Sequence, residues 1–372
     1  MILEKLDSEY IAGRFIEYFS SCSRIDDHMR MRKKERLQSL VPSLPGMEPE
    51  TMLFSDFDMH PQDMEFEIYQ PSPTEFAQML EITSSACYEN SFGKEIKFIV
   101  REKNSGKYVG FCRVASPVLN ARPRNQWLGQ VPDMRIFNRH AVMGFMIVPA
   151  QPFGFNYLGG KLLTLLCTTH EFREQFNRKY DIQTCLFETS SLYGSIKSAS
   201  QYDGLKPFVR YTGDTQSDFV PLFSEAFWWE TMEWFSDKNG GKPLFEREGI
   251  PSYKMKMQMA MNSIIVNSLS VHNKELCEQF KNAVKDSKEN ITTKKRFYIS
   301  TYGYENVKDV LLGKTETLIP GQNFDKHYQD NIIAWWKKKA SARYDSLKSD
   351  GRLRTNLEFW NSDTIDKIDI IR

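Results

Sequence analysis

Residues 141–163, AVMGFMIVPAQPFGFNYLGGKLL, carry three signals that together decide the fold class. The first eight residues form a nearly continuous apolar run, which is typical of a buried β-strand. A proline and a glycine-rich turn follow, and the residues from Leu162 onward have helical character. A strand, a turn and a helix in this order favour a mixed α/β protein whose helices pack on a sheet.

Short strands and helices are predicted on both sides of this stretch. Residues 96–101 and 108–114 are β-branched or apolar runs joined by an Asn-Ser-Gly turn, so they are expected to form a hairpin. Residues 181–188, DIQTCLFE, are predicted to be another short buried strand, and residues 195–202 a short helix.

The chain divides into three parts by composition. Residues 1–93 begin with an amphipathic helix and continue into a segment rich in proline, methionine and acids, so we expect a helical arm and a linker. Residues 94–213 are the predicted α/β core. Residues 214–372 mix aromatic clusters, long helices and a basic tail, and we expect α+β additions there. The basic run MRMRKKER at residues 29–36 is predicted to be a solvated helix face.

Composition excludes several classes of protein. The 372 residues contain 49 Lys and Arg against 48 Asp and Glu, and a net charge of +1 excludes a globally basic coat protein. The six cysteines are scattered without a CxxC pair, which favours a reduced compartment over a disulfide framework. No stretch approaches about 20 apolar residues and the first residues lack a basic lead, so we expect a cytoplasmic protein with no membrane partner.

Three segments resemble the core of the GNAT (Gcn5-related N-acyltransferase) family. Residues 97–114 resemble its central hairpin, residues 141–163 the strand, loop and helix that cradle the coenzyme pyrophosphate, and residues 185–208 the final strand and helix. The resemblance implies a GNAT-like mixed sheet. The motif departs at Asn156, where the family has Gly or Ala, and the loop then runs on before Gly159. A loop of the wrong length would misplace the backbone donors, so we do not expect acetyl-CoA as a cofactor.

A narrower resemblance covers residues 94–213. In order along the chain, VGFCRVASPVLNARPRNQWLG, NRHAVMGFMIVP and NRKYDIQTCLFETS are similar to segments of the DruA family, which belongs to the Druantia anti-phage system and is also found in mobile elements and phages. This resemblance implies a phage or mobile-element protein, located in the host cytoplasm if it is phage-encoded. It also implies that DNA is the ligand or substrate.

The residues themselves allow a DNA ligand. Cationic side chains in and beside the core would contact phosphates, and the tail places Trp335 and Trp336 next to three lysines, as stacking surfaces beside charge. The alternative is a helix whose tryptophans pack inward while the lysines face solvent. The residues expected to contact DNA are Arg122, Arg124, Trp127, Lys161, Lys197, Trp335, Trp336, Lys337, Lys338, Lys339 and Arg343.

Chemistry on DNA has two routes in this sequence. In the preferred, metal-independent route a tyrosine attacks a phosphate, as in nicking or topoisomerase reactions, and cationic groups stabilise the developing charge. The catalytic candidates are Tyr202, Tyr193, Glu188, Arg139 and His140. In the second route, Glu188 with Asp203 or Asp133 would hold Mg²⁺ for a nuclease reaction. Two other functions stay open: an acyl-CoA-dependent N-acyltransferase, and a non-catalytic DNA-binding or phage structural protein.

Overall fold

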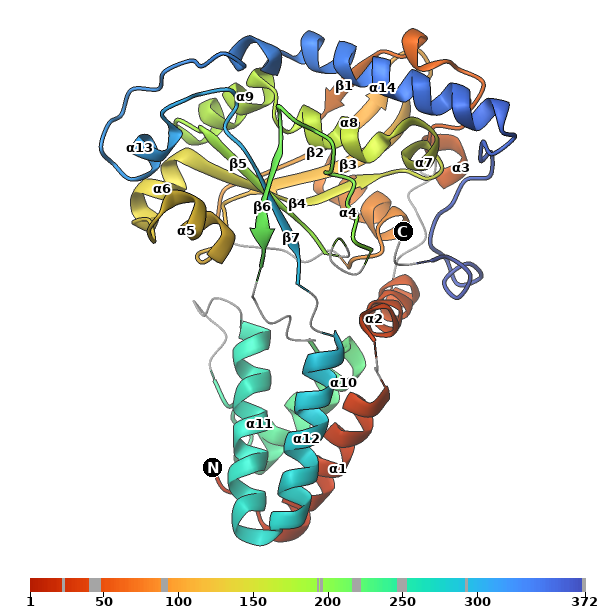
Figure 1. The fold of residues 1–372 in the computed structure, drawn as a ribbon. Helices are drawn as coiled ribbons and strands as arrows, with labels where there is room; N and C mark the ends of the chain where they lie inside the picture. Colours follow the sequence, from red (N-terminus) through yellow and green to blue (C-terminus); the bar gives the residue numbers. More distant parts are fainter. Residues whose placement is uncertain are drawn as a thin grey trace.

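A computed structural model of the chain describes residues 1–21, 24–39, 48–87, 93–192, 194, 197–215, 222–245, 253–291 and 294–369. These residues form two regions, a sheet domain with helices on both faces and a helical bundle that projects from it (Figure 1). The mixed α/β fold predicted from the sequence is confirmed by the sheet domain.

Seven strands form one mixed sheet in the order β1-β2-β3-β4-β5-β7-β6. The strands are β1 (Phe66–Tyr69), β2 (Glu95–Glu102), β3 (Lys107–Ala115), β4 (Ala141–Pro149), β5 (Leu186–Ser191), β6 (Arg210–Asp214) and β7 (Arg296–Ser300). Among these strands the β4–β5 pair is parallel, and the other neighbours are antiparallel. The predicted hairpin is confirmed as the β2–β3 pair, in which Phe98 lies opposite Cys112. The GNAT-like assignment of this sheet stays a prediction.

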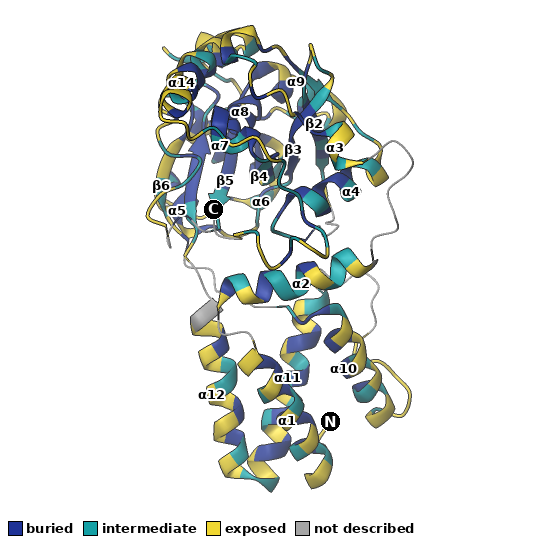
Figure 2. Ribbon diagram, turned by 90° about the vertical axis from the view of Figure 1, so that its right-hand side faces the viewer, coloured by how far each residue is buried: buried dark blue, intermediate teal, exposed yellow. Residues whose placement is uncertain are grey.

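Helices cover both faces of the sheet (Figure 2). One face packs against α7 (Phe153–Tyr157), α8 (Gly159–Leu166), α9 (His170–Tyr180) and α14 (Gln329–Ser349). The opposite face packs against α4 (Pro73–Thr83), α5 (Arg122–Leu128), α6 (Met134–His140) and α13 (Val307–Leu311). The domain also holds the short helices α3 (Pro49–Met52), η1 (Pro61–Asp63) and η2 (Phe324–His327). Because side chains alternate along a strand, Phe187 joins the first core and Leu186 the second.

The helical bundle is built largely from a single insertion in the sheet. Helices α10 (Glu225–Lys238), α11 (Tyr253–His272) and α12 (Lys274–Ile291) lie in the chain between the antiparallel neighbours β6 and β7, and α1 (Lys5–Ser21) completes the bundle. Phe15 lies at its centre, fully buried among aromatic side chains of α10 and α12. The long helices expected in residues 214–372 are therefore present, and the methionine-rich start of α11 is helical.

Helix α2 (Ile25–Ser39) lies between the bundle and the sheet domain and carries the basic run (Figure 2). Lys33 is fully buried, and its ammonium donates to the Glu81 carboxylate at 2.6 Å and to the Glu81 carbonyl at 2.8 Å. Arg30 donates to the carbonyl of Ile365 from the end of the chain. The prediction of a solvated face is therefore wrong for Lys33, because distant acids and carbonyls meet this helix.

Several predicted boundaries move for local reasons. Asp181 ends α9 in the left-handed region with φ 50°, and β5 begins only at Leu186, so the strand predicted from residue 181 is shorter. Residues 197–202 form turns where a helix was predicted, and Ser198 has φ 53°, a value that interrupts a right-handed helix. The three-part division of the chain stays a prediction, although the sheet takes β1 and β7 from outside residues 94–213.

Candidate nucleic-acid interface

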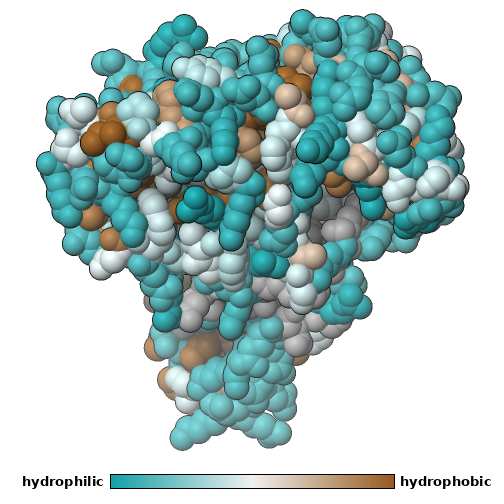
Figure 3. Space-filling model, turned by 45° about the horizontal axis from the view of Figure 1, so that its top comes forward, coloured by the Kyte–Doolittle hydropathy of each residue, from teal (hydrophilic) through white to brown (hydrophobic). Residues whose placement is uncertain are grey.

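Helix α14 turns a basic side to solvent because its apolar residues fall on the other side. The residues that it buries against the sheet domain recur every three or four positions and are Ile332, Trp336, Ala340, Tyr344 and Leu347. Lys338 and Lys339 lie between these positions and are exposed. Figure 3 views the molecule with the α14 end brought forward, and hydrophilic residues predominate on that surface.

The two tryptophans of α14 have different surroundings. Trp336 is fully buried, and its Nε1 donates to the carbonyl of Leu158 at 3.4 Å, so its ring offers no face to a base. Trp335 is half-buried, with its ring centre 5.4 Å from that of Phe208. The ammonium of Lys339 lies 5.7 Å from the Trp335 ring centre. Of the two tryptophans, Trp335 is therefore the one that lies beside an exposed lysine.

Three other lysines predicted to contact DNA differ in their partners and in their exposure to solvent. Lys337 donates to the carbonyl of Gln62 at 2.8 Å, which ties α14 to η1. Lys161 donates to the carbonyl of Asp203, and burial lowers the pKa of its ammonium from the ordinary value. Lys197 is exposed. Lys161 and Lys337 therefore hold neighbouring segments in place through their charged ends.

Two arginines, Arg343 and Arg354, lie over the ring of Phe155 on α7, and the charge of Arg352 also acts on Arg343. The guanidinium carbons of Arg343 and Arg354 lie 4.8 and 3.9 Å from the ring centre. Burial, together with the charges of Arg352 and Arg354, lowers the pKa of Arg343 from its ordinary value. Like charges held this close create a local positive potential that a bound anion would relieve.

Cations on the outer side of α14 and the arginines that follow this helix form one surface. We define the basic face as Lys338, Lys339, Arg343, Arg352 and Arg354. Two of its members form exposed ion pairs, Arg352 with Asp350 at 2.6 Å and Arg354 with Glu358 at 3.4 Å. For the other three, no ion pair is formed within the described residues.

The glycine turn that resembles a coenzyme cradle is covered by the segment after α14. Gln151 forms an antiparallel bridge with Glu358, and the Asn156 side chain donates to the carbonyl of Arg354 at 2.7 Å. The backbone N–H groups of Gly154 and Asn156 donate to carbonyls one turn earlier, at 2.8 and 2.9 Å. The donors that the GNAT resemblance would aim at a pyrophosphate are therefore bonded within the chain.

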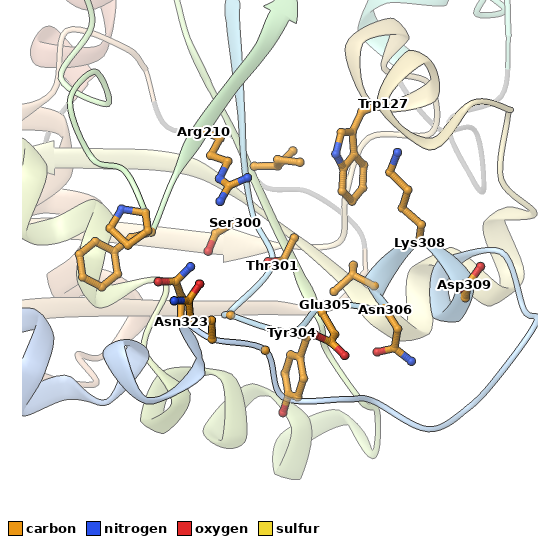
Figure 4. A pocket seen from close by; sticks show the side chains of 17 residues that line it. Trp127, Arg210, Ser300, Thr301, Tyr304, Glu305, Asn306, Lys308, Asp309 and Asn323 are labelled. Carbon is orange, nitrogen blue, oxygen red and sulfur yellow. The ribbon is translucent and has the colours of Figure 1, made fainter.

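A pocket of 540 Å³ opens where β6, β7, α5 and α13 meet. Trp127, Arg210 and Lys308 come from three of these elements and lie toward one side of it, while Asn306 and Asn323 lie toward the other (Figure 4). The Lys308 ammonium is 5.1 Å from the Trp127 ring centre. An aromatic face, two cations and a set of polar side chains thus line one hollow.

The two arginines of α5 face different surroundings. Arg122 is exposed, whereas Arg124 is fully buried and forms an ion pair with Glu188 at 3.3 Å. Arg124 also donates to the carbonyls of Val118 and Leu119, at 2.9 Å each, so its guanidinium does not reach solvent. Burial raises the pKa of Glu188 to about 7, and Oε1 of this carboxyl has no hydrogen-bond partner among the described residues.

The predicted catalytic residues lie in separate places. Tyr202 belongs to the core beneath α8 and α14, where burial raises its pKa to about 12, whereas Glu188 faces α5 on the other side of the sheet. Arg139 and His140 line another hollow, of 260 Å³, and burial lowers the pKa of His140 from its ordinary value. Tyr193 lies outside the described residues. No single site therefore collects the four that are described.

The carboxylates considered for Mg²⁺ are also dispersed. Glu188 is enclosed in β5, Asp203 pairs with Arg296 at 3.2 Å, and Asp133 caps α6. In the part of the chain that the structure describes, no three His, Cys, Asp or Glu side chains are grouped to hold a metal ion. None of the described helices has the length and apolar content that a membrane crossing requires.

Sequence reasoning missed four residues of these surfaces. Arg210 and Lys308 are single charges in unrelated segments, and only the packing of β6 and α13 brings them to one pocket. Phe155 lies in the stretch predicted to be a turn, and its contact with Arg354 joins positions 199 residues apart in the chain. The basic composition of the tail was the one signal that pointed to Arg354.

Comparison with known proteins gives a family for the sheet domain. Residues 65–202 match the family model described as "Druantia protein DruA". A curated protein with the same description, from Escherichia coli (strain UMEA 4076-1), is 24% identical over 103 residues, which is 28% of this chain and 26% of that protein. The match therefore spans only about a quarter of the length of this relative. No solved structure matches the chain.

Proposed function

This chain belongs to the DruA family, and from that premise we propose that it binds DNA through the basic face and the arginine cluster around Phe155. The observation that carries the proposal is the position of Arg343 and Arg354 over one aromatic ring, at 4.8 and 3.9 Å. Guanidinium groups and aromatic rings are the side chains that bind phosphates and stack with bases.

The charges of this face favour an anionic ligand. Within the described residues Arg343 has no carboxylate at ion-pair distance, although it is half-buried next to Arg352 and Arg354. The pairs of Arg352 with Asp350 and of Arg354 with Glu358 are exposed, and such pairs contribute roughly 0–1 kcal/mol each. Phosphates can therefore replace these carboxylates at little cost, while they relieve the repulsion around Arg343.

Salt dependence of binding tests the proposal. The triple variant Lys338→Ala, Lys339→Ala and Arg343→Ala is expected to weaken duplex binding. Its plot of log K against log salt is expected to fall less steeply, with a slope smaller in magnitude by about 2 to 3, because each lost phosphate contact removes about 0.9. Fluorescence anisotropy of a labelled duplex between 50 and 200 mM salt measures both quantities, and five phosphate contacts are expected to make the wild-type affinity fall by roughly 500-fold over this range.

A matched control is available in the helical bundle. Lys274, Lys281 and Lys285 are exposed on α12, so replacing all three by alanine removes the same charge from another surface. This control is expected to keep the wild-type slope. Equal losses in the two triple variants, or no retention of DNA by the wild-type protein at low salt, would show that the basic face is not a DNA interface.

Binding without strand cleavage fits the described residues better, because Tyr202, Glu188, Arg139 and His140 lie in separate places. Acyl transfer is a poorer alternative, since the N–H groups of Gly154 and Asn156 donate to carbonyls of the chain itself. Acetyl-CoA is therefore expected to leave the melting temperature unchanged. At 100 times its Kd a coenzyme would stabilise the protein by about 2.7 kcal/mol, which a thermal shift measurement would detect.

A further inference from the structure

We propose that the pocket between α5, β6, β7 and α13 receives one unpaired nucleotide of the bound DNA. Its base would lie against the ring of Trp127, and its phosphate would lie near Arg210 and Lys308. The inference rests on the proposed DNA-binding function and adds which part of the DNA the protein recognises. The basic face, by contrast, contacts the backbone and carries no information about pairing.

The dimensions and walls of the pocket fit this ligand. Its 540 Å³ lies within the range of about 300–1,000 Å³ that holds small organic ligands. Trp127 is half-buried, so α5 holds its ring in place while part of the ring still lines the hollow. Arg210 is exposed on the edge strand β6 and Lys308 on α13, which places both cations where a phosphate arrives from solvent.

Polar groups on the far side of the pocket can contact the edge of a base. In the described part of the chain no hydrogen bond occupies the side chains of Thr301, Glu305 or Gln322, which all line the pocket. Glu305 can accept a hydrogen bond from an exocyclic amino group, as carboxylates do with cytosine, and Gln322 can both donate and accept. Asn306 differs, because its side chain is bonded to the backbone of Thr317 and Ile319.

The pocket is connected to the basic face through Phe208. Phe208 lines the pocket and packs against Trp335, with ring centres 5.4 Å apart, and Trp335 stands beneath the ammonium of Lys339. Phe208 and Trp335 thus link the wall of the pocket to Lys339 of the basic face, and the proposed path of the strand runs from Lys339 to the pocket. Bases inside a duplex are stacked and show only their edges, so the Trp127 face is open only to a base that has left the stack.

The test compares a fully paired duplex with the same duplex carrying one unpaired, bulged nucleotide. The wild-type protein is expected to bind the bulged duplex about ten-fold more tightly, the size of one base–aromatic stack. Trp127→Ala is expected to remove this preference. Trp127→Phe, which keeps an aromatic face, is expected to retain most of it and guards against a folding defect in the alanine variant.

Trp229→Ala is the matched control, because Trp229 is 60% exposed on α10 in the bundle. This variant is expected to keep the preference. Equal wild-type affinity for the two duplexes, or an unchanged preference in Trp127→Ala, would overturn the inference while DNA binding itself stands. Failure to bind either duplex would overturn the proposed function. A third outcome combines two results: deoxyadenosine monophosphate binds the pocket, and the protein shows no preference for the bulged duplex. This outcome would show that free nucleotides are the ligand and would overturn the assignment to DNA.

Discussion

Helices α2 and α14 carry similarly dense runs of lysine and arginine, and the two runs have different surroundings. On α2, Lys33 is buried against Glu81, and Lys34 pairs with Asp366 at 2.8 Å. On α14, Lys338 and Lys339 are exposed and form no ion pair within the described residues. The first run therefore connects parts of the protein to one another, whereas Lys338 and Lys339 of the second are exposed to solvent.

The difference between the runs lies in the segments that reach each helix. The acids that meet α2 come from α4, from α10 and from the end of the chain, and Arg36 adds a pair with Glu225 at 3.6 Å. The neighbours of α14 on its inner side are apolar, and its outer side has no covering segment among those described. The density of basic residues on a helix thus predicts neither that the helix packs against acidic segments of the same chain nor that it binds DNA. What separates α2 from α14 is where the acidic side chains of the protein lie.

The largest change in unfolding free energy is expected when Lys33 is replaced. Lys33→Met leaves the Glu81 carboxylate buried without its cation, and breaking a buried pair in this way costs about 3–5 kcal/mol of unfolding free energy. The matched variant Lys34→Met breaks an exposed pair and is expected to cost less than about 1 kcal/mol. Urea unfolding measures both changes.

The double variant Lys33→Met, Glu81→Gln separates the ion pair from the loss of a side chain. Removing both charges is expected to recover much of the stability, since an uncharged pair of similar volume carries no unpaired charge. Equal costs for Lys33→Met and Lys34→Met would contradict the contrast drawn between the buried and exposed cations of α2.

A second effect, of about 3 kcal/mol, is expected from the pH dependence of Glu188, the buried partner of Arg124. Its pKa is raised from 4.5 to about 7 in the folded protein, so the folded state holds the proton more tightly than the unfolded state. The stabilising effect is complete below pH 4.5 and is lost as the pH rises through about 7. Urea unfolding of wild type and Glu188→Gln from pH 5 to pH 8 measures it.

The difference in unfolding free energy between wild type and Glu188→Gln is the informative quantity, because the other titrating groups are common to both proteins. This difference should fall as the pH rises from 5 to 7. Parallel curves would mean that Glu188 stays ionised beside Arg124, and that the ion pair outweighs the effect of burial.

Much of the sheet domain follows from periodicity and turn residues. The hairpin at residues 96–114 and the strand at 141–149 are recognisable because their apolar runs are bounded by turn signals. The break between α8 and α9 is harder to predict, because Thr169 caps a new helix with its side chain inside an otherwise helical stretch. The insertion of the bundle between β6 and β7 depends on strand pairing over a long separation, which local patterns do not contain.

The candidate site was less predictable than the fold. Composition indicated a basic tail, and the exposed Lys338 and Lys339 agree with it, but composition does not separate Trp335 from Trp336. Adjacent positions on a helix point about 100° apart, so one tryptophan of the pair enters the core and the other lies at its edge. Arg124 shows the same limit, because an arginine in a basic segment can be the partner of a buried carboxylate.

The smallest effect is expected at Tyr202. Burial raises its pKa to about 12, so at pH 7 only about one molecule in 10⁵ carries the phenolate, and the side chain lies in the core beneath α14. Tyr202→Phe is therefore expected to leave plasmid topology unchanged relative to wild type, and to cost about 0.5–1.5 kcal/mol for the lost hydroxyl. Supercoiled plasmid incubated with each protein, followed by a denaturing gel for a protein–DNA adduct, measures this. Loss of a wild-type adduct in Tyr202→Phe would require this core to open on DNA, whereas an adduct lost only in Tyr193→Phe would place the nucleophile at Tyr193.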